Sequence, residues 1–180
     1  MRGRMLPAWG ALGATLAALL LAPQARADVP TSVAVMDLTF QGEIPPWMSE
    51  RLRQRLEQGL AATGLVMMPA QQIQQALLGS GGSCATSTCR KALGQKLKCD
   101  YLVGGTIQGE ARTYKFQLWI ARADTGEVEA TLKEGCDICG QAKVFSRMEL
   151  LASQLSARMA REDKRPARLL LRSDPPGAGI

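Results

Sequence analysis

The sequence predicts one α/β, or mixed α+β, domain in which a five-stranded sheet of mixed strand direction is packed by amphipathic helices, in the order β-α-β-α-α-β-β-β-α. Two observations predict this class. In the first part of the chain, short apolar runs alternate with segments whose apolar residues recur every third or fourth position, which places parallel strands beside helices. Residues 113 to 133 instead alternate apolar and polar side chains around a turn, which is typical of antiparallel strands.

The first half of the domain is predicted as strand, helix, strand and helix. The β-branched run from Thr31 to Phe40 is suited to a buried strand. Pro45 and Pro46 precede a helix, Gly64 ends it, and residues 65 to 68 form a second short strand. Pro69 then opens another helix. The apolar stripe of the first helix consists of Met48, Leu52, Leu56 and Leu60.

The second half is predicted as a helix, three strands in a meander and a closing helix. A glycine- and serine-rich loop containing Cys84 leads into a helix that runs from about Cys89 to Leu97. The strands cover residues 100–107, 113–121 and 127–133, with turn signals at 109–111 and 124–126. A long amphipathic helix from about Gln141 to Arg161 completes the domain.

The amino terminus has the pattern of a secretory signal peptide. Arg2 and Arg4 precede an apolar run that ends at Ala22, and Ala25 and Ala27 form an A-x-A cleavage site. The apolar run is shorter than the roughly 20 residues that span a bilayer, and no basic stop-transfer patch follows it. We therefore expect residues 1–27 to be removed after Ala27 and the mature chain to be periplasmic or otherwise exported.

The charge pattern gives no indication of a nucleic-acid partner. Loss of the signal peptide removes three arginines and lowers the formal net charge from +6 to +3. A nucleic-acid footprint would need a clustered basic face. One basic cluster is interpreted first as a solvated helix end and linker, and second as a peripheral contact with an anionic membrane or cell wall. Its residues are Arg158, Arg161, Lys164, Arg165, Arg168 and Arg172, interrupted by Glu162 and Asp163.

Four of the five cysteines form two close pairs, Cys84 with Cys89 and Cys136 with Cys139 in the stretch "EGCDICG". If the helix after Cys84 runs antiparallel to the strand that follows it, the predicted strand directions place all four at one edge of the sheet and Cys99 about 20 to 30 Å away. An oxidising compartment favours structural disulfides between these four residues and leaves Cys99 as a free thiol. An all-cysteine zinc site and a thioredoxin-like redox pair are the alternatives, and the disulfide connectivity stays open.

The sequence contains no convincing catalytic constellation. The chain has no histidine, which excludes a Ser-His-Asp triad and the usual catalytic zinc patterns. The glycine-rich stretches "GSGG" and "VGGTIQG" lack the residues of a phosphate loop, and Asp37 and Asp124 are isolated acids. We therefore predict no catalytic residue, metal or cofactor. The alternative function is a thiol-disulfide or metal-dependent activity at the expected four-cysteine edge.

The order of elements from residue 32 to 161 resembles the amino-terminal α/β domain of TolB. It also resembles related modules of envelope accessory proteins, including curli-secretion and penicillin-binding-protein activator lipoproteins. The resemblance lies in "SVAVMDLTF", "GLVMMPAQQIQQAL", "ALGQKLKCDYLVGGTI" and "FQLWIARADTGEVEATLK". It implies that residues 28–163 form a non-enzymatic interaction or scaffold module of the cell envelope whose partners are envelope proteins. The cysteine pairs are not part of the TolB pattern.

The end of the chain carries a second resemblance. The stretch "ARLLLRSDPPGAGI" is similar to the opening strand and turn of a PEGA domain, with Pro175, Pro176, Gly177 and Ala178 in place of the tetrapeptide that names the domain. Proline stands where that family has glutamate. We expect residues 164–180 to be a linker and an incomplete PEGA-like β segment, and the chain to be either the product of a truncated gene sequence or a fragment of a longer protein.

The signal-peptide assignment predicts that the exported protein begins at Asp28, because the A-x-A pattern ends at Ala27. Intact-mass measurement of the protein purified from an exporting host checks the cleavage site. A membrane-associated form that keeps its amino terminus would contradict the assignment.

Overall fold

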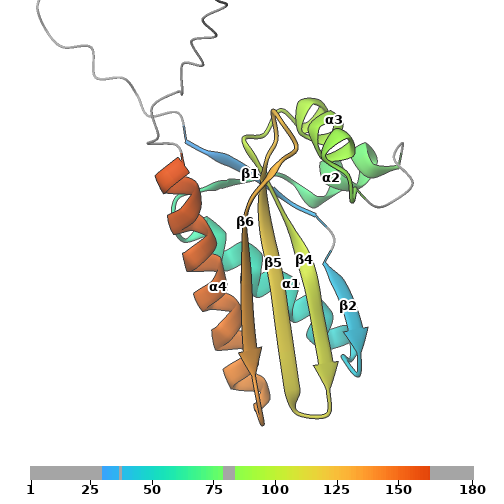
Figure 1. The fold of residues 1–180 in the computed structure, drawn as a ribbon, viewed down its shortest axis with the longest axis vertical. Helices are drawn as coiled ribbons and strands as arrows, with labels where there is room; N and C mark the ends of the chain where they lie inside the picture. The colour runs from blue at the N-terminus through green and yellow to red at the C-terminus, as the bar shows by residue number, and fades with distance from the viewer. Residues whose placement is uncertain (1–29, 37, 79–83, 163–180) are drawn as a thin grey trace, which may run out of the picture.

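The computed structural model describes residues 30–36, 38–78 and 84–162. These residues form six strands and four helices, drawn in Figure 1. The strands are β1 (Ser32–Val35), β2 (Thr39–Gly42), β3 (Val66–Met67), β4 (Tyr101–Glu110), β5 (Thr113–Arg122) and β6 (Val128–Cys136). The helices are α1 (Pro46–Ala61), α2 (Ala70–Leu77), α3 (Ser87–Leu97) and α4 (Gln141–Glu162).

The strands form one open, mixed sheet, which confirms the predicted fold class. The sheet has the neighbour order β3-β1-β4-β5-β6, and β2 also pairs with β4. β1, β2 and β3 belong to parallel pairs, whereas β4, β5 and β6 form an antiparallel meander. The expected signal peptide, Asp37 and the PEGA-like segment lie outside the described residues.

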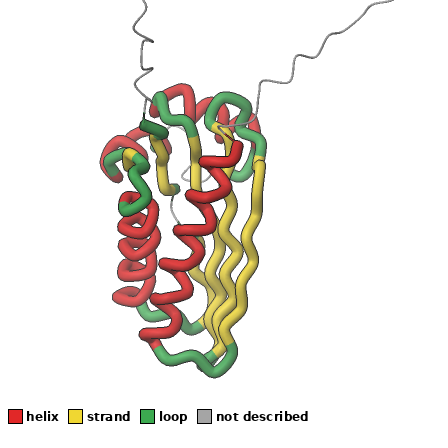
Figure 2. Tube along the Cα trace, turned by 90° about the vertical axis from the view of Figure 1, so that its left-hand side faces the viewer, coloured by secondary structure: helices red, strands yellow, loops and turns green. Residues whose placement is uncertain are grey.

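The helices pack on the two faces of the sheet to different extents. α1 and α4 lie beside each other along one face, as Figure 2 shows. α2 and α3 lie near the β5–β6 turn, at the upper end of Figure 1. We call that end the α3 end, and the end with the β4–β5 turn the hairpin end. No helix in the described ranges combines the length and apolar character needed to cross a membrane.

The predicted strand from Thr31 to Phe40 is two strands, so the sheet has six strands in the described residues rather than five. Val35 pairs with Val103, and Thr39 pairs with Thr106. The segment that joins β1 to β2 therefore has one residue more between these two pairs than the facing part of β4 has. The extra residue reverses which face the following side chains occupy. The apolar residues before and after Asp37 suit either face of the sheet, so their pattern does not indicate this offset.

The offset separates two hydrophobic cores. Met36 packs in the core beneath α2 and α3, whereas Leu38, two residues later, packs in the larger core beneath α1 and α4. The larger core contains the predicted α1 stripe of Met48, Leu52, Leu56 and Leu60, together with Tyr101, Phe116, Leu118, Met148, Leu151 and Leu155. The four-residue spacing of the stripe therefore identified the buried face of α1 correctly.

Two glycines let α3 pack closely on the β5–β6 turn. Gly126 has φ +74°, and a Cβ there would lie 1.9 Å from the carbonyl oxygen of Ser87. A Cβ on Gly94 would lie 2.5 Å from the Cβ of Ala123. Larger residues at either position would push α3 away from the sheet.

Leu56→Asp should unfold the domain, because it places a carboxylate in the core at a cost of several kcal/mol, against a total stability of about 5 to 15 kcal/mol. Thermal melting followed by circular dichroism measures the loss. Gln58→Asp is the matched control on the exposed side of the same helix and should melt close to the wild type. Equal melting temperatures for the two variants would mean that the face of α1 is misassigned. Arg53 is a poorer control, because its side chain is 25 % exposed and pairs with Glu50 and Glu57.

Candidate functional site

The two cysteine pairs lie at opposite ends of the sheet, so the prediction that four cysteines gather at one edge is wrong. Cys136 pairs with Tyr114 at the hairpin end, whereas Cys84 and Cys89 pack at the α3 end in the same core as Cys99. The length of β5 separates the pairs by about 30 Å. The prediction assumed that α3 runs antiparallel to β4, but α3 begins beside the β5–β6 turn, against Gly126.

This separation removes the geometric basis for a four-cysteine zinc site. A tetrahedral site needs its four sulfurs about 2.3 Å from one metal ion, which pairs at opposite ends of a sheet cannot provide. Among the described residues, no group of three or more histidine, cysteine, aspartate or glutamate side chains is placed to hold a metal. The alternative activity that required a single cluster of cysteines therefore has no site in this fold.

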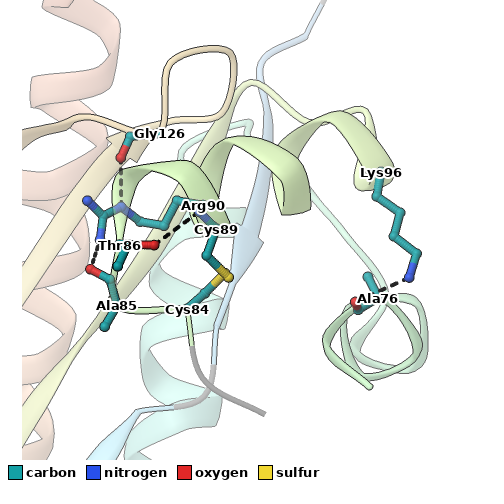
Figure 3. Close-up of a disulfide and its surroundings, with 8 residues drawn as sticks. All are labelled: Ala76, Cys84, Ala85, Thr86, Cys89, Arg90, Lys96 and Gly126. Carbon is teal, nitrogen blue, oxygen red and sulfur yellow. Dashed lines mark hydrogen bonds between the residues drawn. A yellow bond between two sulfur atoms is a disulfide. The ribbon is translucent and has the colours of Figure 1, made fainter. Parts of the chain in front are cut away.

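The disulfide between Cys84 and Cys89 closes the loop that leads into α3. Its Cα atoms lie 5.3 Å apart, and the hydroxyl oxygen of Thr86 accepts a hydrogen bond from the Cys89 backbone N–H as the helix cap. The guanidinium of Arg90, beside the disulfide in Figure 3, donates from Nε to the Gly126 carbonyl at 2.7 Å and from Nη1 to the Ala85 carbonyl at 2.6 Å. This buried arginine thus joins the loop to the β5–β6 turn.

The disulfide between Cys136 and Cys139 closes a four-residue ring between β6 and α4. Both cysteines are buried, with relative exposures of 3 % and 4 %, and the Cys139 backbone N–H donates to the Arg112 carbonyl in the β4–β5 turn at 2.8 Å. Thiol-disulfide exchange requires access of an attacking thiolate to a sulfur atom. The ring is therefore better suited to fixing the start of α4 than to redox chemistry.

Ile138 is held inside this ring in an unusual conformation. It has φ +52°, a left-handed backbone that β-branched residues rarely adopt, and it is 75 % exposed. An exposed apolar side chain on a strained backbone contributes nothing to the core. Such outliers persist only where the surrounding structure enforces them, and they cluster at functional sites. The disulfide and the bond to Arg112 provide that enforcement here.

Trp47 lies at the same end of the domain and is 51 % exposed. α1 and α4 run in the same direction, because Arg51 stacks on Phe145 and Gly59 packs on Ala152. Trp47 precedes Arg51 by one helical turn, so it lies at the same end of the helix pair as the first turn of α4, which follows the Cys136–Cys139 ring. The hairpin end therefore displays two exposed apolar side chains on rigid supports, and we take Trp47, Ile138 and the ring as the candidate binding site.

The remaining predicted site residues have structural surroundings. Cys99 is buried, and burial raises the pKa of its thiol to about 11. Asp124 accepts two hydrogen bonds from the Arg122 guanidinium, at 3.1 and 3.0 Å, and these lower the pKa of the carboxyl group. Arg122 in turn stacks on Tyr101. Asp124 therefore stabilises the β5–β6 turn, as expected of an isolated acid in a turn.

Sequence reasoning missed Trp47, Ile138 and Arg90. An isoleucine in the otherwise polar segment "EGCDICG" was the available signal for an exposed anchor. Trp47 lies just after two prolines, outside the four-residue stripe that begins at Met48. Nothing in the pattern distinguishes Arg90 from the solvated charges of the same helix.

Fold and site together define an α/β module with an exposed apolar tip. No family model matches the chain, and no curated protein matches it in sequence.

Solved structures share the fold. Lipoprotein GNA1162 from Neisseria meningitidis matches over 73 % of this chain and 97 % of its own, with a TM-score of 0.51 and 14 % identity. The carboxy-terminal domain of LpoB from Salmonella enterica matches over 62 % of this chain and 87 % of its own (TM-score 0.48, 18 % identity). TolB from Acinetobacter baumannii matches over 76 % of this chain and 29 % of its own (TM-score 0.42, 10 % identity). At 14 % identity, the comparison with GNA1162 shows a shared fold.

We predict that the oxidised protein has one free thiol, Cys99, and that non-reducing peptide mapping finds Cys84 joined to Cys89 and Cys136 joined to Cys139. At pH 8, a thiol of pKa about 11 is about a hundredfold less ionised than one of pKa 9. Folded protein should therefore react slowly with a thiol reagent and stoichiometrically once denatured. The same shift makes unfolding easier between about pH 9 and 11, where the unfolded thiol loses its proton first. Rapid labelling of several thiols would contradict the assignment.

Proposed function

We propose that this chain is an exported, non-enzymatic module that binds another protein of the cell envelope through its hairpin end. The observation that carries the proposal is the exposed Ile138, held on a left-handed backbone inside the Cys136–Cys139 ring. Tryptophan is enriched among residues that dominate binding energy, and a side chain fixed before binding loses little entropy. Trp47 has the first property, and the constrained backbone of Ile138 provides the second.

The fold and the signal-peptide pattern support the envelope as the place of action. The similar fold of GNA1162 belongs to a lipoprotein, and the amino terminus of the present chain has the features of a secretory signal. Disulfides in a small domain fit an oxidising compartment. The lack of histidine and the opposite positions of the cysteine pairs favour binding over catalysis.

Ile138→Asp and Trp47→Asp should each weaken partner binding by more than about tenfold, because loss of a buried anchor costs roughly 2 kcal/mol or more. The matched control is Leu78→Asp, which adds the same charge at an 84 % exposed apolar residue at the end of α2. Proteins retained from envelope extracts by each immobilised variant are quantified by mass spectrometry. Unchanged thermal melting shows that the variants are folded.

The proposal requires a defined set of envelope proteins that the wild type and the Leu78 variant retain and that both hairpin-end variants lose. Equal retention by all four forms would contradict it, and so would loss with the Leu78 variant alone. Enzymatic turnover that survives the hairpin-end substitutions would assign the chain to a different class of protein.

A further inference from the structure

The sheet face opposite α1 and α4 has a polar surface beyond the part that α2 and α3 cover. Alternation along the strands defines it: Leu102, Trp119 and Ala121 pack in the core beneath α2 and α3, so residues at even spacing from them face the same way. Ile107, Phe116 and Leu118 occupy the opposite core. The open face consists of the residues that continue the Leu102, Trp119 and Ala121 side of the strands toward the hairpin end.

Strand register arranges the open face in two rungs that cross the sheet. Paired residues lie side by side on one face, so each rung is continuous from β2 to β6. The rungs cover about 15 Å, the width of four strands. The first rung is Thr39, Thr106, Gln117 and Lys133, and the second is Gln41, Gln108, Lys115 and Gly135.

The chemistry of the rungs is restricted to amides, hydroxyls and ammonium groups. Polarity alone is expected of a sheet face in water. The informative feature is that neither rung contains a carboxylate, although the chain has 16 acidic residues. Lys115 and Lys133 form no ion pair with any residue that the structure describes. The two rungs therefore carry positive charge without a counter-charge of their own.

The rungs line a shallow hollow of about 490 Å³. Its other lining residues are Phe116, whose side chain is buried in the opposite core, and Glu134, whose carboxylate lies 3.7 Å from Arg147 of α4. The side-chain amide Nε2 of Gln108 donates to the side-chain oxygen Oε1 of Gln41 at 2.8 Å, which aligns these two side chains across the hollow. A neighbouring hollow toward the β4–β5 turn shares Gln41, Gln108 and Lys115 with the first and adds Glu43 and Glu110. The carboxylates nearest to Lys115 in this hollow therefore lie toward the turn and outside the two rungs.

We propose that this open face binds an acidic glycan, a polyhydroxylated chain that carries carboxylate groups. Glutamine amides and threonine hydroxyls both donate and accept hydrogen bonds, which matches the paired capacity of sugar hydroxyls. The two lysines supply charge-assisted bonds to carboxylates. A protein partner is disfavoured, because binding energy at protein interfaces is concentrated in aromatic and other buried anchors, and the rungs contain none.

The test titrates the exported protein with an oligogalacturonate, a carboxylate-bearing glycan, and measures binding by calorimetry. We expect saturable binding that weakens by about tenfold or more in the double variant Lys115→Gln, Lys133→Gln, because it loses two charge-assisted hydrogen bonds. The control Lys91→Gln, Lys143→Gln removes the same charge from exposed sites on α3 and α4 and should leave binding unchanged. Ile138→Asp should also bind normally, which separates this site from the hairpin end.

Two further probes distinguish a glycan site from a simple positive surface. The double variant Gln108→Ala, Gln117→Ala keeps both lysines and should still lose several-fold in oligogalacturonate affinity. Poly-glutamate and a neutral maltooligosaccharide should bind at least about tenfold more weakly than oligogalacturonate. Equal affinity for poly-glutamate would overturn the proposal in favour of charge attraction alone. Absence of oligogalacturonate binding, or binding insensitive to both double variants, would also overturn it.

Discussion

The domain depends on burial of one face of the β4–β5–β6 meander beneath α1 and α4. Phe116 and Leu118 of the sheet pack against the α1 stripe and against the inner face of α4. Close approach of the two helices requires small residues, because a Cβ on Gly59 would lie 2.6 Å from the Cβ of Ala152. α1 and α4 cover one face of the long strands. On the other face, α2 and α3 cover only the α3 end, so the part toward the hairpin end is open to water or to a ligand.

The same contact positions the hairpin end. Parallel packing of α1 and α4 brings both helix starts to the β4–β5 turn, where the Cys136–Cys139 ring makes the connection from β6. The C-x-x-C spacing therefore has a geometric role, because the ring reverses the chain within four residues and keeps Ile138 outside the core. Redox and metal chemistry would instead need accessible sulfurs or additional ligands.

Burial could be predicted from the sequence where it follows the local spacing of apolar residues. It could not be predicted where it depends on the orientation of a helix relative to the sheet. The four-residue period of α1 and the two-residue period of β5 identified the buried residues, because each period repeats the geometry of its element. The orientation of α3 depends instead on the contact between Ser87 and Gly126, 39 residues further along the chain, and no periodicity records such a contact. That error placed Cys84 at the wrong end of the sheet. The strand break after Val35 could not be predicted for a related reason. Residues that face either core are apolar, so apolar character does not distinguish the two faces.

Each disulfide joins cysteines that are close in sequence, with separations of 5 and 3 residues. The sheet, in contrast, needs β1 and β2 to find β4 across about 68 residues, and closing such long loops is the slow part of folding. In an oxidising environment, an unfolded chain can thus form its native sulfur pairs before the sheet assembles, since the nearest thiol is the correct partner in both cases. Oxidation and folding become independent events, and the chain has little need of disulfide reshuffling on its way to the native state.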